Sequence, residues 1–395
     1  MLREIDSGAF LRRLSDLGIA LSPHLQPTPS EQSVQSIAVT RKPLPYLNYA
    51  PSAGTSTASD PVALSIDLQR RALLLTDQFS SPDGSAIRYS VMLPSSEMAA
   101  MEAVAAQLHS LPLYRLAPLS FAAKFSFWAN LYNALVIHAT AVLGPVEDSP
   151  AARGAFFRGE TGAQYSVGGV LLSLDDIEHG ILRSNAPHPG PTGQTQEQQQ
   201  PYFSMRPIAL TDALPMCSAP VHQQRVVDER LQLVLPRLDP RVHFVLNCGA
   251  RSCPAVKIMP GDGGDDGAAL EAALALAAKL YLKDTVSLRW ADEGEALEGE
   301  GEREGEGEGG EGGKARAMVE VTLPKLLLWY GRDFAPTPRG VVARAASLLT
   351  AGGGGGGEDR DAWELSDELK EALLSSAGGL RVVYGPYSWA APRRE

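Results

Sequence analysis

Apolar side chains recur at helical spacing in the first part of the chain, between residues 61 and 143. The pattern predicts one helix from residue 61, a second over residues 95–111 and a third over residues 119–143. The third segment is the most hydrophobic of the chain, but Lys124 and several polar side chains interrupt it. A membrane-spanning helix needs roughly 20 uninterrupted apolar residues. We therefore expect a buried helix here and no membrane span.

Short apolar segments in the second half of the chain predict strands. Residues 165–172 contain a Gly-Gly pair that suits a hairpin turn, and residues 242–248 (VHFVLNC) are apolar enough on both faces for a buried central strand. Two more strands are expected at residues 319–323 and 380–384, and an Ala/Leu-rich helix at residues 268–282. The elements do not alternate regularly, which is typical of an α+β fold. We expect a mainly helical single domain packed around a small sheet, with disordered insertions.

Composition divides the chain into three parts. Residues 1–20 have the spacing of a short amphipathic helix, and residues 21–60 are rich in Ser, Pro and Thr, as in a linker. The rest, residues 61–395, is predicted to be one domain. Three low-complexity segments interrupt that domain and are expected to be surface insertions, at residues 184–201, 292–313 and 352–357.

The net charge of the chain is concentrated in one of these insertions. Residues 292–313 hold ten acidic residues and one arginine, so they account for nine of the eleven net negative charges. The remainder is nearly neutral and lacks the concentrated basic surface that nucleic-acid binding requires. We therefore expect no nucleic-acid partner, while an unknown small-molecule or peptide substrate and protein partners stay open.

Cysteine content and the N-terminal segment bear on the cellular compartment. Three cysteines, Cys217, Cys248 and Cys253, are too few and odd in number for a disulfide framework. Acidic residues interrupt the apolar run that a secretory signal would need. These features predict a cytoplasmic protein. Organelle import is the alternative, because three arginines lie among the first 13 residues.

Three polar side chains, Asn130, Asn133 and His138, lie within the otherwise apolar segment FWANLYNALVIH. At 100° per residue they fall within about 140° of one another on a helix. A buried polar group without a partner costs roughly 1–3 kcal/mol, so these side chains must face one another, a loop backbone or a pocket. Two roles stay open, the pinning of loop carbonyls and the lining of a pocket.

A second polar group lies in the segment SLDDIEHGILR. Ser173 and Asp176 have the spacing of a capping box, which predicts the start of a helix. Glu178 and His179 would project to one side of that helix, and His179 would face Arg183 one turn later. A histidine close to carboxylates can transfer protons near neutral pH. A charge-paired helix face with a satisfied histidine is the alternative.

Two cysteines follow the predicted strand at residues 242–248. Cys248 would end that strand, with Gly249 allowing a tight turn. Cys253 precedes Pro254, a residue suited to the first position of a helix. A helix starting there would lower the pKa of the Cys253 thiol through its positive end. Both cysteines are therefore candidate nucleophiles, and the alternative is a pair of buried cysteines that act as small hydrophobic side chains.

The spacing of potential metal ligands does not match a known metal site. The histidines at positions 138, 179 and 243 lie far apart in the sequence, and Cys-x4-Cys is not a standard zinc spacing. It is not the Cys-x-x-Cys of thioredoxin-like centres either. We therefore expect no metal ion and no other cofactor.

Taken together and in this order, these motifs resemble the family called domain of unknown function 547. The resemblance includes an F-W-x-N-L-Y-N-A-L helix, a Y-x-[VI]-G-G segment leading to S-L-D-D-I-E-H-x-I-L-R, and a D-P-R-x-x-F-x-L-x-C-G-x-x-S-[CS]-P block. A later W-Y-x-x-D-F motif and a C-terminal aromatic strand complete it. The matching motifs lie at residues 127–135, 165–183, 239–254, 329–334 and 383–389.

The resemblance ranks the candidate residues. In the family pattern the first cysteine is the steadier one and the second can be serine, which favours Cys248 over Cys253 as the reactive thiol. The family's C-terminal hallmark Y-D-W-S-L-N begins here as Tyr387-Ser388-Trp389, so its aspartate is missing, and its asparagine is missing as well. If that aspartate contributes to a site, the site of this chain is altered.

Three hypotheses about function follow. The first is a thiol-dependent hydrolase or acyl transferase in which Cys248 is the nucleophile and His179 is the base. Glu178 or Asn130 would orient that base. The substrate would be bound by Asn133, His138, Arg183 and Cys253. The second hypothesis is a non-catalytic binding or scaffold module of a signalling assembly, and the third is a dithiol redox protein.

Overall fold

The computed structural model of the chain describes most of the predicted domain. The described residues are 46–49, 60–82, 86–146, 149–189, 200–205, 228–261, 264–290, 302–304, 319–351, 360–375 and 380–389. The helix predicted at residues 1–20 lies outside them, as do most of the predicted linker, most of the three insertions and Cys217.

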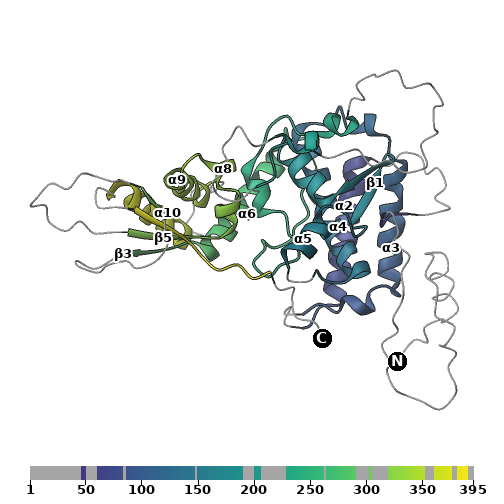
Figure 1. The fold of residues 1–395 in the computed structure, drawn as a ribbon, viewed down its shortest axis with the longest axis horizontal. Coiled ribbons are helices and arrows are strands. Elements are labelled where there is room, and N and C mark those ends of the chain that lie inside the picture. The colour runs from purple at the N-terminus through teal and green to yellow at the C-terminus, as the bar shows by residue number, and fades with distance from the viewer. Residues whose placement is uncertain are drawn as a thin grey trace, which may run out of the picture.

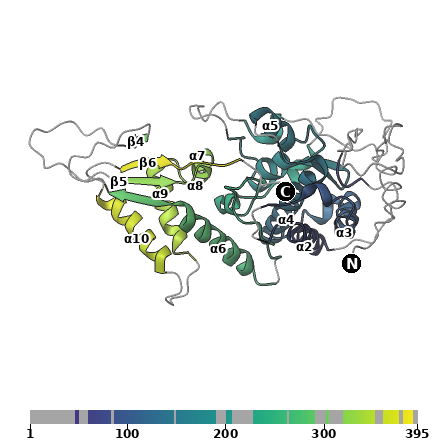
Figure 2. The same cartoon turned by 90° about the horizontal axis from the view of Figure 1, so that it is seen from below.

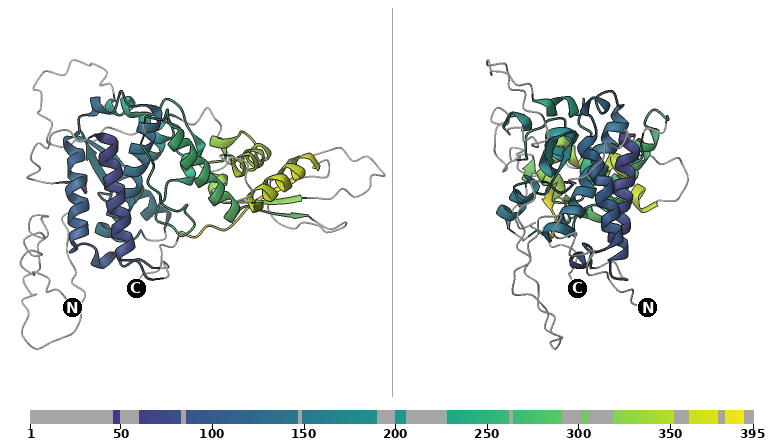
Figure 3. Two further views of the ribbon diagram at one scale, coloured as in Figure 1. Left: turned by 180° about the vertical axis from the view of Figure 1, so that it is seen from behind. Right: turned by 90° about the vertical axis from the view of Figure 1, so that its right-hand side faces the viewer.

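A helical body forms the larger part of the fold (Figure 1). It contains α2 (Pro61–Gln78), α3 (Ser96–Ala105), α4 (Phe121–Leu143) and α5 (Pro150–Phe157). Helix α2 packs against both α3 and α4, and Figure 3 shows α2 and α3 side by side from behind, in purple and blue. Each helix begins where a side-chain oxygen accepts backbone N–H groups of the first turn, which are otherwise unsatisfied. The capping residues are Asp60, Ser95, Ser120 and Ser149.

Helix α4 runs through the core of this body. Nineteen of its 23 residues are buried, including Trp128, Phe125 and Phe127. The prediction of a buried helix is therefore confirmed. Within the described part of the chain, every helix falls short of the length and apolarity that crossing a bilayer demands.

A hairpin and a helix follow α5 in the chain. Strands β1 (Gln164–Val167) and β2 (Val170–Ser173) pair antiparallel around Gly168 and Gly169, whose φ angles are +58° and +87°. The π-helix η4 (Asp176–Leu182) then begins at the predicted capping box. Ser173 Oγ accepts from the Asp176 N–H at 3.1 Å, and Asp176 Oδ2 accepts from the Ser173 N–H at 2.9 Å. Both the hairpin and the capping box are therefore confirmed.

The strand predicted at residues 242–248 is wrong. The segment begins with the 3-10 helix η8 (Pro240–Phe244) and continues as irregular chain. Asp239 Oδ1 accepts from the Arg241 N–H at 3.0 Å, and Pro240 occupies the first helical position. Both features start a helical turn, and a short apolar run does not distinguish such a turn from a strand.

A four-stranded sheet lies at the end of the molecule away from α2 and α3 (Figure 2). Its strand order is β3-β5-β6-β4, with β5 and β6 parallel and the outer pairs antiparallel. The helices α6, α9 and α10 lie on one face of it (Figure 2). The strands are β3 (Ser287–Trp290), β4 (Glu302–Glu304), β5 (Val319–Leu323) and β6 (Leu380–Tyr384), and the helices are α6 (Ala268–Thr285), α9 (Pro338–Leu349) and α10 (Arg360–Ser375).

Short helices connect these parts, and one hydrophobic core runs through both the helical body and the sheet layer. The predicted α+β fold, mainly helical with small sheets, is confirmed. After β6, residues 385–389 return from the sheet to the helical body near α5 (Figure 1, yellow). The short helices are η1 (Tyr89–Val91), η2 (Ala106–Ser110), η3 (Leu113–Arg115), η6 (Tyr202–Met205), η7 (Glu229–Leu233), α7 (Leu326–Trp329) and α8 (Gly331–Phe334).

Packing around η4 allows no side chain at Gly180. A Cβ at this position would overlap the ring of Phe203, and Arg230 covers that ring at 4.4 Å, so the ring has little room to move. We predict that Gly180→Ala lowers the free energy of unfolding by about 1–3 kcal/mol, as overpacked cores do. Urea denaturation measures this. Gly331→Ala is the control, because its Cβ would meet Val341 at an ordinary 3.5 Å. Equal stability of the two variants would contradict the prediction.

Candidate active site

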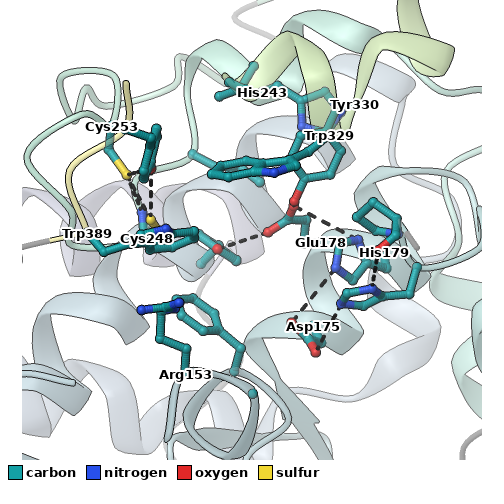
Figure 4. A pocket seen from close by; sticks show the side chains of 18 of the residues that line it. Arg153, Asp175, Glu178, His179, His243, Cys248, Cys253, Trp329, Tyr330 and Trp389 are labelled. Carbon is teal, nitrogen blue, oxygen red and sulfur yellow. Dashed lines mark hydrogen bonds and ion pairs between the residues drawn. The ribbon is translucent and has the colours of Figure 1, made fainter. Parts of the chain in front are cut away.

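A cavity of about 410 Å³ lies between the helical body, α7 and the C-terminal segment (Figure 4). Its walls combine aromatic side chains, two cysteines and several ionisable groups. The two cysteines lie on one side, and Glu178, His179 and Asp175 lie on the other (Figure 4). The side chains used below are those of Tyr132, Arg153, Arg158, Asp175, Glu178, His179, His188, His243, Cys248, Cys253, Trp329, Tyr330, Tyr387 and Trp389.

The two thiols contact each other and the hydroxyl of Tyr387. The Sγ atoms of Cys248 and Cys253 are 2.8 Å apart. The Tyr387 hydroxyl lies 3.2 Å from the Cys253 sulfur and 3.5 Å from the Cys248 sulfur. The backbone N–H of Cys248 also donates to the Cys253 sulfur at 3.2 Å. The Cys253 sulfur is therefore surrounded by hydrogen-bond donors.

Two asparagines shape the loop that holds these thiols. Asn133 of α4 donates to the Val245 carbonyl at 2.9 Å and accepts from the Asn247 N–H at 2.9 Å. The Asn247 side chain in turn accepts from the Gly249 N–H at 2.7 Å and donates to the Pro254 carbonyl at 2.8 Å. Gly249 has a φ of +86°, a conformation that favours glycine. The loop is thus fixed to the buried helix on one side and closed on itself on the other.

The thiols have opposite pKa shifts. The hydrogen bond to Cys253 and burial raise the pKa of the Cys248 thiol well above its ordinary value. Burial alone would raise the pKa of Cys253 as well, but hydrogen bonds from Cys248, Tyr387 and the backbone outweigh it and lower this pKa to about 7. These opposite shifts favour a pair that shares one proton in the range above about pH 7, with the charge on Cys253 and the proton on Cys248.

Glu178 lies in the opposite wall of the cavity and accepts hydrogen bonds from two tyrosines. Tyr132 donates to Glu178 Oε2 at 2.9 Å, and Tyr330 donates to Oε1 at 2.6 Å. Burial raises the pKa of both tyrosines well above the ordinary value, so both hydroxyls stay protonated and act as donors. The Glu178 carboxylate thereby lies between the thiols and His179 (Figure 4).

His179 belongs to a cluster with Asp175 and His188. One ligand-type atom of each lies within 4.8 Å of the others, a spacing at which a metal ion could bind. However, Arg183 Nη1, which can only donate, lies 3.0 Å from His179 Nδ1. Burial lowers the pKa of His179 well below its ordinary value, so the neutral ring carries its proton on Nε2. A metal ion at Nε2 would need that nitrogen unprotonated, so Arg183 opposes coordination there.

The remaining predicted site residues lie on other sides of α4. Asn130 donates to the Met259 carbonyl at 3.0 Å and accepts from the Met259 N–H at 2.8 Å, so it fixes a second loop. His138 Nδ1 contacts the Tyr165 hydroxyl at 2.9 Å. Neither residue lines the cavity, and neither does Asn133. The amides of Asn130 and Asn133 contact loop backbone, which is one of the two roles left open by the sequence.

The match to a known family is confined to the middle of the chain. Residues 116–282 match the family model described as "Protein of unknown function, DUF547". This protein contains a DUF547 domain. No curated protein and no solved structure matches the chain.

The DUF547 segment supplies only part of the cavity. It contains both thiols, Glu178 and His179, but the wall over the thiols comes from residues beyond its end. Trp329, Tyr387 and Trp389 form an aromatic cluster with ring centroids 4.8–5.3 Å apart, and Arg153 lies over the Trp389 ring at 4.4 Å.

Ser388 takes the place of the aspartate in the family's C-terminal hallmark. It is exposed and does not line the cavity, and its N–H donates to Ser252 Oγ at 2.9 Å. The residue that differs from the family pattern therefore lies outside the wall that faces the thiols.

Two features of the DUF547 site were not predicted from the sequence. No helix begins at Pro254, so the expectation that a helix end would lower the Cys253 pKa is wrong. The hydrogen bonds described above lower it instead. The role of Tyr387 was also missed, because nothing in the local sequence shows that residue 387 returns to residue 253. Cys248 and His179 share the cavity, but no hydrogen bond joins them among the described contacts.

Asp333 of α8 joins the sheet layer to the DUF547 segment. It accepts from Arg183 at 2.7 and 2.9 Å and from His243 at 2.7 Å. Burial alone would raise the Asp333 pKa, but the hydrogen bonds from His243 and Arg183 outweigh it and hold this pKa well below the ordinary value. Asp333 belongs to the W-Y-x-x-D-F motif, the one sequence signal that pointed to it.

We predict that Asp333→Asn lowers the free energy of unfolding by about 3–5 kcal/mol, because Arg183 and His243 would stay buried without their acceptor. The wild type should lose this difference as pH falls below about 4, since the folded pKa of Asp333 lies below the unfolded one. Urea unfolding at several pH values measures both. The control is Glu271→Gln, which removes an ion pair with Arg241 whose carboxylate is 65% exposed. This variant should lower the free energy of unfolding by less than about 1 kcal/mol. A similar loss in both variants would count against a buried junction.

Proposed function

We propose that the protein catalyses thiol–disulfide exchange in this cavity, with Cys253 as the attacking thiolate and Cys248 as the resolving thiol. The observation that carries this proposal is the 2.8 Å separation of the two sulfurs within one cavity wall. A disulfide requires a separation of about 2.05 Å, so a shift of less than about 1 Å joins them. The ionisation of one sulfur and the protonation of the other match the two roles.

The exchange proceeds in two displacements. The Cys253 thiolate attacks one sulfur of a substrate disulfide, the substrate S–S bond breaks, and the first substrate thiolate leaves with a proton from solvent. Cys248 then loses its proton and attacks Cys253 Sγ, which releases the second substrate thiol. The protein pair is oxidised to a disulfide by two electrons, and the substrate disulfide is reduced to two thiols.

Charge and shape of the cavity define the substrate class. The cavity volume of about 410 Å³ fits a small molecule or the end of a peptide. Two arginines, Arg153 and Arg158, balance Asp175 and Glu178, and the aromatic wall offers apolar contact. We therefore expect a small organic or peptidic disulfide without a strong net charge.

Thiol-dependent hydrolysis or acyl transfer is the second candidate. It is favoured by one observation, that Cys248, Glu178 and His179 line the same cavity. The base would have to act from His179 Nε2, the nitrogen that carries the proton when Arg183 donates to Nδ1. The thiol pair, by contrast, needs no separate base, because hydrogen bonds from Cys248, Tyr387 and the backbone lower the Cys253 pKa to about 7, so exchange is the better-supported function.

The pKa asymmetry of the pair gives a first prediction. In a Cys217→Ser background, iodoacetamide should label Cys253 ahead of Cys248, with a midpoint near pH 7. Tyr387→Phe removes one donor to the thiolate and should raise the midpoint by about one unit. Tyr281→Phe is the matched control, because its hydroxyl donates to the Ser252 carbonyl instead of a sulfur. Peptide mass spectrometry identifies the labelled cysteine, and labelling of Cys248 before Cys253 would refute the assignment. A non-catalytic module would instead show the ordinary thiol midpoint of about pH 8.5.

Turnover separates exchange from acyl transfer. In a single turnover without added thiol, the reduced wild type should release both thiols of bis(2-hydroxyethyl) disulfide, Cys248→Ser only one and Cys253→Ser none, because Cys253 makes the first attack and Cys248 the second. An acyl-transfer enzyme would instead hydrolyse p-nitrophenyl acetate and would lose activity mainly with its single nucleophile. Loss of ester hydrolysis in Cys248→Ser and His179→Ala, with disulfide reduction absent from the wild type, would overturn the proposal in favour of the second candidate.

A further inference from the structure

A second cavity lies behind the thiol pair. Its volume is about 560 Å³, and Cys253, Pro254 and Tyr387 line both this cavity and the first. Cys248 lines only the first. Cys253 therefore contributes to both of these cavities, and Cys248 to the first of the two.

The second cavity has a different charge from the first. Its wall carries Arg251, Lys257 and Lys325 against a single carboxylate, that of Asp284. Within the part of the chain that the structure describes, none of these three cations forms an ion pair. The first cavity has no such excess, because two arginines there face two carboxylates. Cations without partners around a cavity raise the local concentration of anions.

We propose that this second cavity, named the basic cavity, admits a small anionic thiol that reduces the Cys248–Cys253 disulfide by attacking Cys253. This inference rests on the exchange proposed above. Displacement at sulfur proceeds in line, so the entering sulfur must approach Cys253 from the side away from the departing Cys248. We assign that side to the basic cavity, because Cys253 lines it and Cys248 does not.

The reduction balances with two molecules of thiol. The first thiolate bonds to Cys253 Sγ, the Cys248–Cys253 bond breaks, and Cys248 leaves as a thiolate that takes up a proton. The second thiolate attacks the bound sulfur of the mixed disulfide and releases Cys253 as the thiolate. Two thiols are oxidised to one external disulfide, and the protein disulfide is reduced. This attack on Cys253 is the reverse of the displacement in which Cys248 releases the second substrate thiol, so both steps use the side of Cys253 away from Cys248.

The test compares three small thiols that differ in charge. The protein, in a Cys217→Ser background, is oxidised, and the loss of two hydrogens is confirmed by mass. Its disulfide is then reduced with 3-mercaptopropionate, 2-mercaptoethanol or cysteamine at low ionic strength, and rate constants are expressed per thiolate. We expect the anionic thiol to react about tenfold faster than the cationic one. The difference should shrink with added salt, because salt screens the cations.

Variants that remove positive charges test whether the basic cavity causes the preference for the anionic thiol. Lys257→Gln combined with Lys325→Gln should reduce the tenfold difference to about twofold, whereas Lys370→Gln on helix α10, which does not line the cavity, should leave it unchanged. In Cys248→Ser, 3-mercaptopropionate disulfide should form a mixed disulfide at Cys253 that persists. Equal rates for the three thiols, or a preference that survives the double variant, would overturn the role of the basic cavity. Failure to form the Cys248–Cys253 disulfide would instead overturn the exchange itself, so the two failures are distinguishable.

Discussion

The site depends on one constraint, the need of polar side chains buried on helix α4 to find hydrogen-bond partners. Asn130, Asn133 and Tyr132 are buried in a mainly apolar helix, where a missing partner costs roughly 1–3 kcal/mol each. Their partners are the Met259 backbone, the Val245–Asn247 backbone and the Glu178 carboxylate. Each bond ties a separate loop or helix to the same core element. The hydrogen bonds that satisfy the polar side chains of α4 therefore also fix the positions of the thiols and of Glu178.

The sequence was sufficient to predict elements whose hydrogen-bonding residues lie only a few positions apart. The Gly168–Gly169 turn and the box of Ser173 and Asp176 were predicted, since each is decided within about ten residues. The apolar run at residues 242–248 was misread because its hydrophobicity fits several conformations, and the helical signal lay just before it, in Asp239 and Pro240. The prediction of secondary structure therefore failed where apolar residues reflect burial and have no helical or strand periodicity.

Partners distant in sequence explain the limits on predicting the site. The motifs identified Cys248, Cys253, Glu178 and His179, and these four do line one cavity. They did not reveal that Tyr387, 134 residues beyond Cys253, reaches the sulfurs, or that Asp333 engages Arg183 across 150 residues. The first contact depends on the C-terminal segment returning from the sheet, and the second on the packing of α8 against the segment that carries Arg183. No local spacing encodes either.

Hydrogen bonds rather than a cation stabilise the thiolate, and this determines how the pair would respond to oxidation. A buried thiolate is costly, so converting it to an uncharged disulfide removes an unfavourable charge from the interior. The donors around Cys253 act in the opposite direction, because they stabilise the reduced pair and a disulfide sulfur accepts their hydrogen bonds only weakly. The two effects oppose each other, and the exchange proposed above requires them to be of similar size. A pair of that kind can cycle between both states, as a catalyst of exchange must, whereas a structural disulfide would need the first effect to dominate.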